Sequence, residues 1–301
     1  VEPVSRGFYR LASLEPLVAL ELEGRLTATR RADGGAGIAL RGLGFVTGEG
    51  VRWPPGDLDL SWSRAADGSV AGGEFSAQRL DLALVADTAA RLPLGATLRQ
   101  VLAELQPKGI ANGLRAAWKG PLAALASYRF SGRFEALSVA ARLPADGHRL
   151  GRPGVTGVDI DLDASEQGGS ARIALRDGTI DLPGVFEDPL VALDDLRADL
   201  VWRIQPVAGG AAALQVQVRS AQFANADAAG ELQATWSTSP GAARLPGRLE
   251  LDGKLTRGNA TRAARYLPLA LPEGVRRYVH DAVRGGAIKS ASYRVSGDLT
   301  D

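Results

Sequence analysis

The chain has 301 residues, of which 35 are basic and 34 acidic, so its net charge is only +1. This balance argues against a nucleic-acid-binding protein, which needs a basic surface to displace counterions. The chain has no Cys, which excludes disulfides, thiolate metal sites and a Cys nucleophile. It also has no Met, and we interpret it as a segment of a longer protein.

Alternation of apolar and polar residues runs along most of the chain and predicts antiparallel strands with one dry and one wet face. Residues 158–163, for example, alternate three aliphatic side chains with three aspartates. Similar runs occur at residues 18–23, 58–62, 214–219 and 249–252. Gly-containing turn signals separate the runs, at residues 33–35, 67–68, 168–169, 177–178 and 209–210. We predict about fourteen strands and a mostly β fold.

Two segments interrupt this alternation and predict helices. Residues 84–105 are expected to form two short helices on either side of a Leu-Pro-Leu sequence, and residues 261–284 are expected to form a second pair. In the second pair, apolar residues between 275 and 283 recur at helical spacing. We expect both pairs to cover a sheet edge or flank an apolar groove, because exposed sheet edges require protection.

The two helical segments resemble each other in sequence. Residues 89–94 are similar to residues 263–269, and each segment is followed by a Gly and then by a strand that ends in Gly. A repeat of about 175 residues predicts a module of several strands with a helical cap. We therefore predict a first β module at residues 1–122 and a second at 123–301, within a longer rod.

Signatures of catalysis are missing from the sequence. The chain has two His, His148 and His280, too few and too far apart for a metal site with three or four ligands. A Ser-His-Asp triad would need one of them, and there is no nucleophile elbow to support it. We interpret the adjacent Glu187 and Asp188 as part of a tight loop. We therefore expect no catalytic residue, no metal, no cofactor and no enzymatic activity.

The apolar strand faces leave two architectures open. Two sheets could close on each other as a sandwich. Alternatively, one long curled sheet could line a groove with its dry face, which is favoured by the aliphatic character of that face and by the scarcity of helices. Fourteen strands at about 4.8 Å spacing would extend roughly 65 Å, and a sheet that long must curl, split or twist.

Several stretches resemble the YhdP family, which belongs to the AsmA-like, TamB-related proteins of Gram-negative bacteria. The most specific stretch is residues 178–189, followed by residues 196–202. Residues 73–77, 151–157 and 265–268 are also similar. The resemblance follows nearly the whole chain in consistent order, and none of its motifs is catalytic.

This resemblance implies a fold, a location and a function. It implies a long curled antiparallel sheet with a hydrophobic groove, in the periplasmic part of a protein anchored in the inner membrane. It further implies phospholipid transfer between the inner and outer membranes, as part of outer-membrane biogenesis. The expected partners are phospholipid acyl chains, with the two membranes reached through other parts of the protein, and no nucleic acid. The alternatives are a periplasmic assembly scaffold with a closed β core and, more remotely, an enzyme of envelope polysaccharide.

The predicted groove-lining residues are the apolar members of the alternating runs. They are Val18, Leu20, Leu22, Leu58, Leu60, Trp62, Val158, Ile160, Leu162, Leu214, Val216, Val218, Leu249 and Leu251. Ordinary core packing is the alternative role for each of them.

Overall fold

The computed structural model describes most of the chain. The described residues are 19–31, 34–48, 50, 52–89, 96–121, 124–143, 151–207, 211–239 and 247–298. Val18, His148 and the Leu-Pro-Leu sequence of the first predicted helix pair lie outside them.

In the described residues, fourteen β-strands form a single sheet, in agreement with the predicted fold class. The strands of the first half are β1 (Ala19–Arg30), β2 (Ala36–Thr47), β3 (Arg52–Arg64), β4 (Val70–Asp81), β5 (Lys108–Lys119), β6 (Ser127–Val139) and β7 (Gly154–Ser165). Those of the second half are β8 (Gly168–Asp181), β9 (Leu190–Gln205), β10 (Ala213–Ala224), β11 (Ala228–Ser237), β12 (Arg248–Asn259), β13 (Ala287–Ile288) and β14 (Ala291–Asp298).

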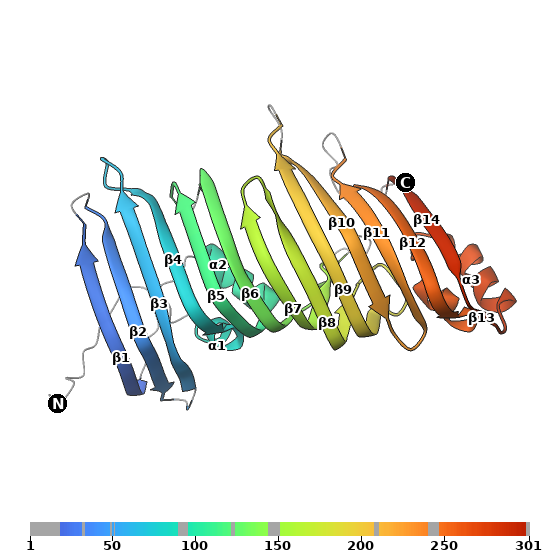
Figure 1. Cartoon of the computed structure of the whole chain (residues 1–301), viewed down its shortest axis with the longest axis horizontal. Coiled ribbons are helices and arrows are strands. Elements are labelled where there is room, and N and C mark those ends of the chain that lie inside the picture. The colour runs from blue at the N-terminus through green and yellow to red at the C-terminus, as the bar shows by residue number, and fades with distance from the viewer. Residues whose placement is uncertain are drawn as a thin grey trace.

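The topology is an antiparallel meander. From β1 to β12 each strand is hydrogen-bonded to the next strand in the sequence, and both β13 and β14 pair with β12. No pairing joins β1 to β14 among the described residues, so the sheet is open at both edges (Figure 1). Because the described strands form one sheet and not two, the sandwich architecture does not apply.

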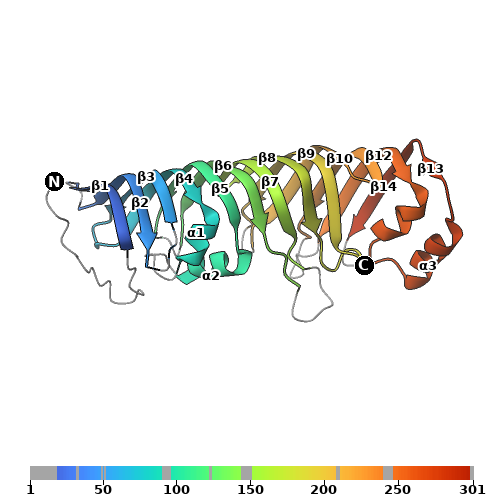
Figure 2. The same cartoon turned by 90° about the horizontal axis from the view of Figure 1, so that it is seen from below.

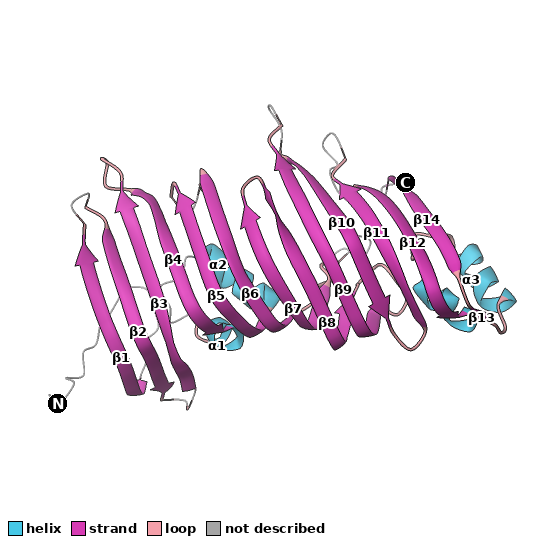
Figure 3. Ribbon diagram, viewed as in Figure 1, coloured by secondary structure: helices cyan, strands magenta, loops and turns pink. Residues whose placement is uncertain are grey.

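Four helical segments lie between strands, at the two places where alternation fails in the sequence. They are α1 (Leu82–Asp87), α2 (Ala96–Leu105), η1 (Ala260–Tyr266) and α3 (Glu273–Ala282). The first two connect β4 to β5, and the other two connect β12 to β13. All four lie on the same side of the sheet (Figure 2), near one end of the strands (Figure 3).

Local capping explains where α1 and η1 begin. The Asp81 side chain at the end of β4 accepts hydrogen bonds from the backbone N–H groups of Ala83 and Leu84, which starts α1. Asn259 at the end of β12 accepts from the N–H of Thr261 in the same way. The segment after Asn259, the first helix of the second predicted pair, is a 3₁₀-helix. The second helix of that pair, α3, is an α-helix.

A line of β-bulges crosses the sheet. The register shifts within most strand pairs, for example next to Gly24 in β1, Gly113 in β5 and Gly157 in β7. These glycines have φ values of +136°, +57° and +79°, which side chains disfavour. Asp177-Gly178 is not a turn between strands, as its sequence predicts, but a similar irregularity inside β8, with Asp177 at φ +50°. Since each bulge bends its strand, the whole line curves the sheet.

Candidate functional site

The strand register gathers the apolar residues of all the long strands on one side of the sheet, which we call the apolar face. Directly opposed residues of antiparallel strands share a face, so rows can be followed from strand to strand. One row runs through Leu60, Phe75, Ala116, Phe130, Ala164, Gly169, Trp202, Val216, Trp236 and Leu249. A neighbouring row runs through Gly132, Leu162, Ala171, Leu200, Val218, Ala234, Leu251 and Val295. The apolar surface is therefore continuous across the sheet.

Twelve of the fourteen predicted groove-lining residues lie on the apolar face. Leu22, Leu58, Leu60, Trp62, Val158, Ile160, Leu162, Leu214, Val216, Val218, Leu249 and Leu251 lie on the apolar face through the pairings of their strands. Leu20 lies next to a bulge at the start of β1 and is 69% exposed. The alternation thus identifies the face, while the role of these residues in lining a groove stays a prediction.

Burial shows which way the sheet bends. The buried apolar residues of the strands lie on the apolar face, and several adjoin a bulge: Leu114 follows Gly113, and Val158 follows Gly157. Leu175, two residues before Asp177, is only 1% exposed. In a single sheet, side chains become buried where the sheet closes toward their own side. The apolar face is therefore the inner side of the bend.

The rest of the apolar face remains partly open. Most of its residues are half-buried, including Val216 and Val218, and no second sheet covers them in the described part of the chain. At the two edges the exposed fraction rises to 63% for Leu22 and 47% for Val295. Globular domains normally bury such a face against another layer, so an open apolar face of this extent indicates a binding surface.

Helices cover one end of this face, at the strand ends where β4 leads into α1, and we call this end the helix margin. Leu82 of α1 packs against the buried cluster of Ala77, Ala111 and Leu114.

The helix α2 is held at the helix margin by polar contacts. Its Glu104 carboxylate lies 3.3 Å from the Arg142 guanidinium and 3.5 Å from that of Arg152. Arg152 also donates a hydrogen bond of 2.6 Å to the backbone carbonyl of Glu104. The pKa of the Glu104 carboxyl is lowered, first by the hydrogen bond from Gln100 and then by the two arginines.

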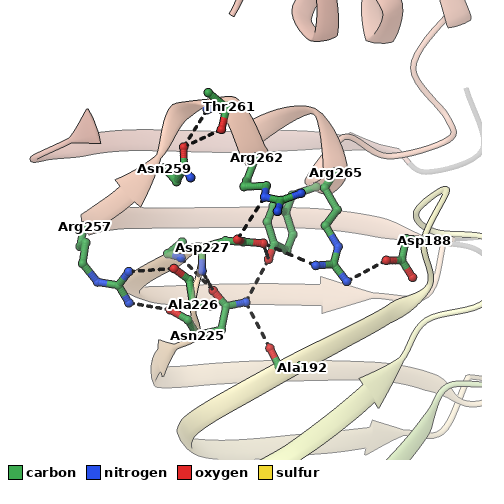
Figure 4. Close-up of polar contacts among 12 residues, drawn as sticks. Asp188, Ala192, Asn225, Ala226, Asp227, Arg257, Asn259, Thr261, Arg262 and Arg265 are labelled. Carbon is green, nitrogen blue, oxygen red and sulfur yellow. Dashed lines mark hydrogen bonds and ion pairs between the residues drawn. The ribbon is translucent and has the colours of Figure 1, made fainter. Parts of the chain in front are cut away.

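A second polar cluster holds η1 at the same margin (Figure 4). Asn225, at the connection between β10 and β11, donates hydrogen bonds to the Ala192 carbonyl at 3.2 Å and to the Tyr266 hydroxyl at 3.0 Å. That hydroxyl donates to the Asp227 carboxylate at 2.9 Å. Burial raises the pKa of Tyr266, and the bond to Asp227 raises it further. The Tyr266 hydroxyl therefore stays protonated, as this donor role requires.

Arginines of η1 complete the cluster. Arg265 lies 2.7 Å from the Asp188 carboxylate and 3.5 Å from Asp227, and Arg262 lies 3.7 Å from Asp227 (Figure 4). Arg276 of α3 approaches Glu187 at 3.7 Å. The adjacent carboxylates at 187 and 188, interpreted from the sequence as part of a tight loop, thus lie in the β8–β9 connection and bind the helical cover.

Aromatic residues mark the opposite end of the apolar face, where short turns connect the strands; we call this end the hairpin margin. Gly73 of β4 pairs with Trp62 of β3 on one side and with Trp118 of β5 on the other. Trp118 pairs in turn with Tyr128 of β6. Trp202 and Trp236 are both opposite Val216, near the turns of β9 and β11. Only Trp62 of this set is predicted from the sequence, because alternation reveals the face of a residue but not the row that it shares with distant strands.

The other face of the sheet carries charged side chains. Arg41 approaches Asp59 at 2.7 Å, and Arg294 approaches Asp252 at 2.5 Å. The hydrogen bond from Arg41 is the main reason why the pKa of the Asp59 carboxyl is lowered. A hollow of about 580 Å³ on this face is lined by both acidic and basic groups, among them Glu74 and Arg115. This mixture of charges does not favour a ligand of either sign.

Within the described residues, no three His, Asp or Glu side chains gather in a way that could hold a metal ion. His280 is exposed on α3, and its Nδ1 lies 3.1 Å from the neighbouring Asp281 carboxylate. Across the same part of the chain, none of the helices has the length and apolar character needed to cross a membrane.

Comparison with known proteins identifies the family. The family described as YhdP protein matches the chain over residues 9–301. Neither a curated protein nor a solved structure gives a match. The family match extends over nearly the whole open sheet and both helical insertions, and the chain therefore belongs to the YhdP family.

Proposed function

We propose that this chain is a segment of an envelope-spanning bridge that carries phospholipid between the inner and outer membranes along its apolar face. Membership of the YhdP family suggests an AsmA-like role related to lipid transport. The observation that carries the finer proposal is the apolar face itself, which is continuous across the sheet, curved inward and mostly uncovered. In this proposal the chain is a periplasmic, non-enzymatic part of an inner-membrane-anchored protein.

The energetics of lipid transfer fit a surface of this kind. A phospholipid with two long acyl chains would expose about 30 methylene groups to water, at a cost of roughly 24 kcal/mol at ~0.8 kcal/mol each. An apolar surface that is continuous from strand to strand lowers this cost at every position. Since fourteen strands extend roughly 65 Å at about 4.8 Å spacing, one chain of this kind supplies a long stretch of such a path. A conduit also needs no deep specific pocket, because a lipid held too tightly would not move on.

The scaffold hypothesis makes a different structural demand. A closed β core requires a second layer over the apolar face, and in the described residues only short helical segments at the helix margin lie over it. If a lipid-binding experiment finds no lipid on the folded chain, its result would support the scaffold hypothesis.

The test compares substitutions on the two faces of one strand. The purified chain is mixed with phospholipid vesicles, separated from them, and analysed for bound lipid by native mass spectrometry. Val218→Asp, in the middle of β10 and on the apolar face, is expected to abolish lipid binding, because a charge at the acyl chains is strongly disfavoured. Gln217→Asp is the matched control, because Gln217 is exposed on the polar face of the same strand. The proposal fails if the folded wild-type chain takes up no lipid, or if the two variants bind lipid equally well.

A further inference from the structure

We infer that bound phospholipid has a fixed orientation on the apolar face, with its phosphate at the hairpin margin and its acyl chains running parallel to the strands toward the helix margin. This inference rests on the proposed function and specifies how the lipid lies. It is carried by the different chemistry of the two margins and by the length of the apolar surface between them.

The hairpin margin has the chemistry of a membrane interface. Trp62, Trp118, Tyr128, Trp202 and Trp236 lie on the apolar face near the strand ends. The large rings of Trp and Tyr are apolar but carry a polar N–H or O–H group, and these residues concentrate where lipid headgroups meet acyl chains. The helix margin also carries aromatic rings, but they pack on one another or on the core: Trp53 stacks on Phe45, Tyr266 meets Phe186 edge-on, and Phe134 packs against the buried cluster of Ala77, Ala111 and Leu114.

Positive charges accompany this aromatic row. Lys119 directly follows Trp118 and Arg203 follows Trp202, so both begin on the polar face of the sheet. Arg129 follows Tyr128, but its charge is offset by the nearby Glu166 carboxylate. Lys119 and Arg203 form no ion pair in the described part of the chain, and both are exposed; Lys119 is the last residue of β5 and Arg203 the third from the end of β9. Long basic side chains at such positions can reach around the strand end toward an anionic phosphate. The hairpin margin therefore combines aromatic rings with charges complementary to a phosphodiester.

Between the aromatic row and the bend, the apolar surface is about as long as one acyl chain. Between Trp202 and Leu196 on β9 the strand advances six residues, or about 20 Å at ~3.3 Å per residue. The hydrocarbon core of a bilayer is about 30 Å thick, so each leaflet contributes about 15 Å. A chain that begins at the aromatic row thus ends near the bend at Leu175 and Leu196, where the side chains are most buried.

The orientation is tested by fluorescence quenching in the lipid-bound chain. Four of the five Trp residues lie at the hairpin margin, and the fifth, Trp53, stacks on Phe45 at 5.3 Å between ring centroids, at the other end of β3. Trp53→Phe therefore leaves emission from the row alone. Phospholipids carrying a quencher at the headgroup, in the middle of the chain, or near its end are bound in turn. The loss of emission should be greatest for the headgroup quencher and smallest for the chain-end quencher.

Each outcome has a defined meaning. The reverse order, or equal quenching by all three lipids, would overturn the inferred orientation while leaving the proposed function intact, since lipid would still be bound. Lipid detected by mass spectrometry without any quenching would also overturn the orientation. If no lipid binds to the folded chain, the proposed function fails and the orientation fails with it.

A charge variant provides an independent readout. Replacing both Lys119 and Arg203 by Gln should lower affinity for an anionic phospholipid about fivefold per charge, at ~1 kcal/mol for each basic residue near a charged lipid surface. The affinity for uncharged diacylglycerol should not change. Lys254→Gln, which removes an exposed charge from the middle of the polar face, is the control and should affect neither lipid. If the control variant lowered the affinity for anionic phospholipid as much as the double variant, the phosphate could not be assigned to the hairpin margin.

Discussion

Leu175 provides the sharpest test of the bend that curves the sheet. Its side chain is 1% exposed and packs with Val158 and Leu193 beside the line of bulges. Leu175→Ala removes three carbon atoms, worth about 2.4 kcal/mol at ~0.8 kcal/mol each. A void that does not collapse adds up to about 1 kcal/mol. We expect the free energy of unfolding to fall by about 3 kcal/mol, near the low end of the ~2.7–5.0 kcal/mol known for buried Leu→Ala changes.

The matched control is Leu22→Ala. Leu22 lies on the same face but is 63% exposed, so its truncation should cost less than about 1 kcal/mol. Urea unfolding followed by Trp emission measures both values, and hydrogen exchange should show faster opening of β7 to β9 in the Leu175 variant alone. Equal costs for the two variants would refute the argument that the sheet closes toward its apolar face at the bulges.

Three further predictions concern the margins of the sheet. Gly169→Ala should destabilise the chain by about 1–3 kcal/mol, because the new methyl group would overlap both the backbone carbonyl of Asp163 and the ring of Trp202. Gly297→Ala, which has open space around it, should not, and an equal effect in urea unfolding would contradict this close packing at Gly169. Because burial raises the pKa of Tyr266 above its usual 10.0, its contribution to stability should be complete below pH 10 and decline as the pH rises through the folded-state pKa. Tyr266→Phe should remove that part of the pH dependence, and an unchanged profile in alkaline unfolding measurements would refute it. The lowered pKa of Glu104 predicts the opposite dependence, with its contribution present above its usual 4.5 and lost in more acidic solution. Glu104→Gln should accordingly speed hydrogen exchange in α2 at neutral pH and have little effect at low pH.

The sequence was sufficient to predict the strands but not their registers. Alternation is a local property, so residues 158–163 and 214–219 could be assigned to strands with one apolar face, and the count of fourteen is confirmed. Which residues lie side by side depends on turns and bulges. Asp177-Gly178 illustrates the difficulty, because a residue with positive φ followed by Gly suits both a hairpin turn and a bulge inside a strand.

Long-range polar contacts were equally inaccessible from the sequence. The hydrogen bond between Asn225 and Tyr266 joins residues 41 positions apart, and no local pattern indicates that pair. The two helical segments predicted within residues 261–284 are confirmed, whereas the contacts that hold the first of them, between Asn225 and Tyr266, depend on tertiary structure. The division into two modules at residues 122 and 123 stays a prediction, since both residues lie outside the described part of the chain.

The meander, in which each strand pairs with the next from β1 to β12, has a consequence for how such proteins can change in length. Adding or removing one hairpin alters the long dimension by about 9.6 Å, or two strand spacings. Each strand that flanks the added or removed hairpin keeps its hydrogen-bonded neighbour on the side away from it. Because a hairpin holds two antiparallel strands, the chain leaves it running in the same direction as before. Length is therefore adjustable in hairpin units without redesigning the cross-section. The same local connectivity keeps contacts close in sequence, so the sheet can assemble progressively from either end as its strands become available.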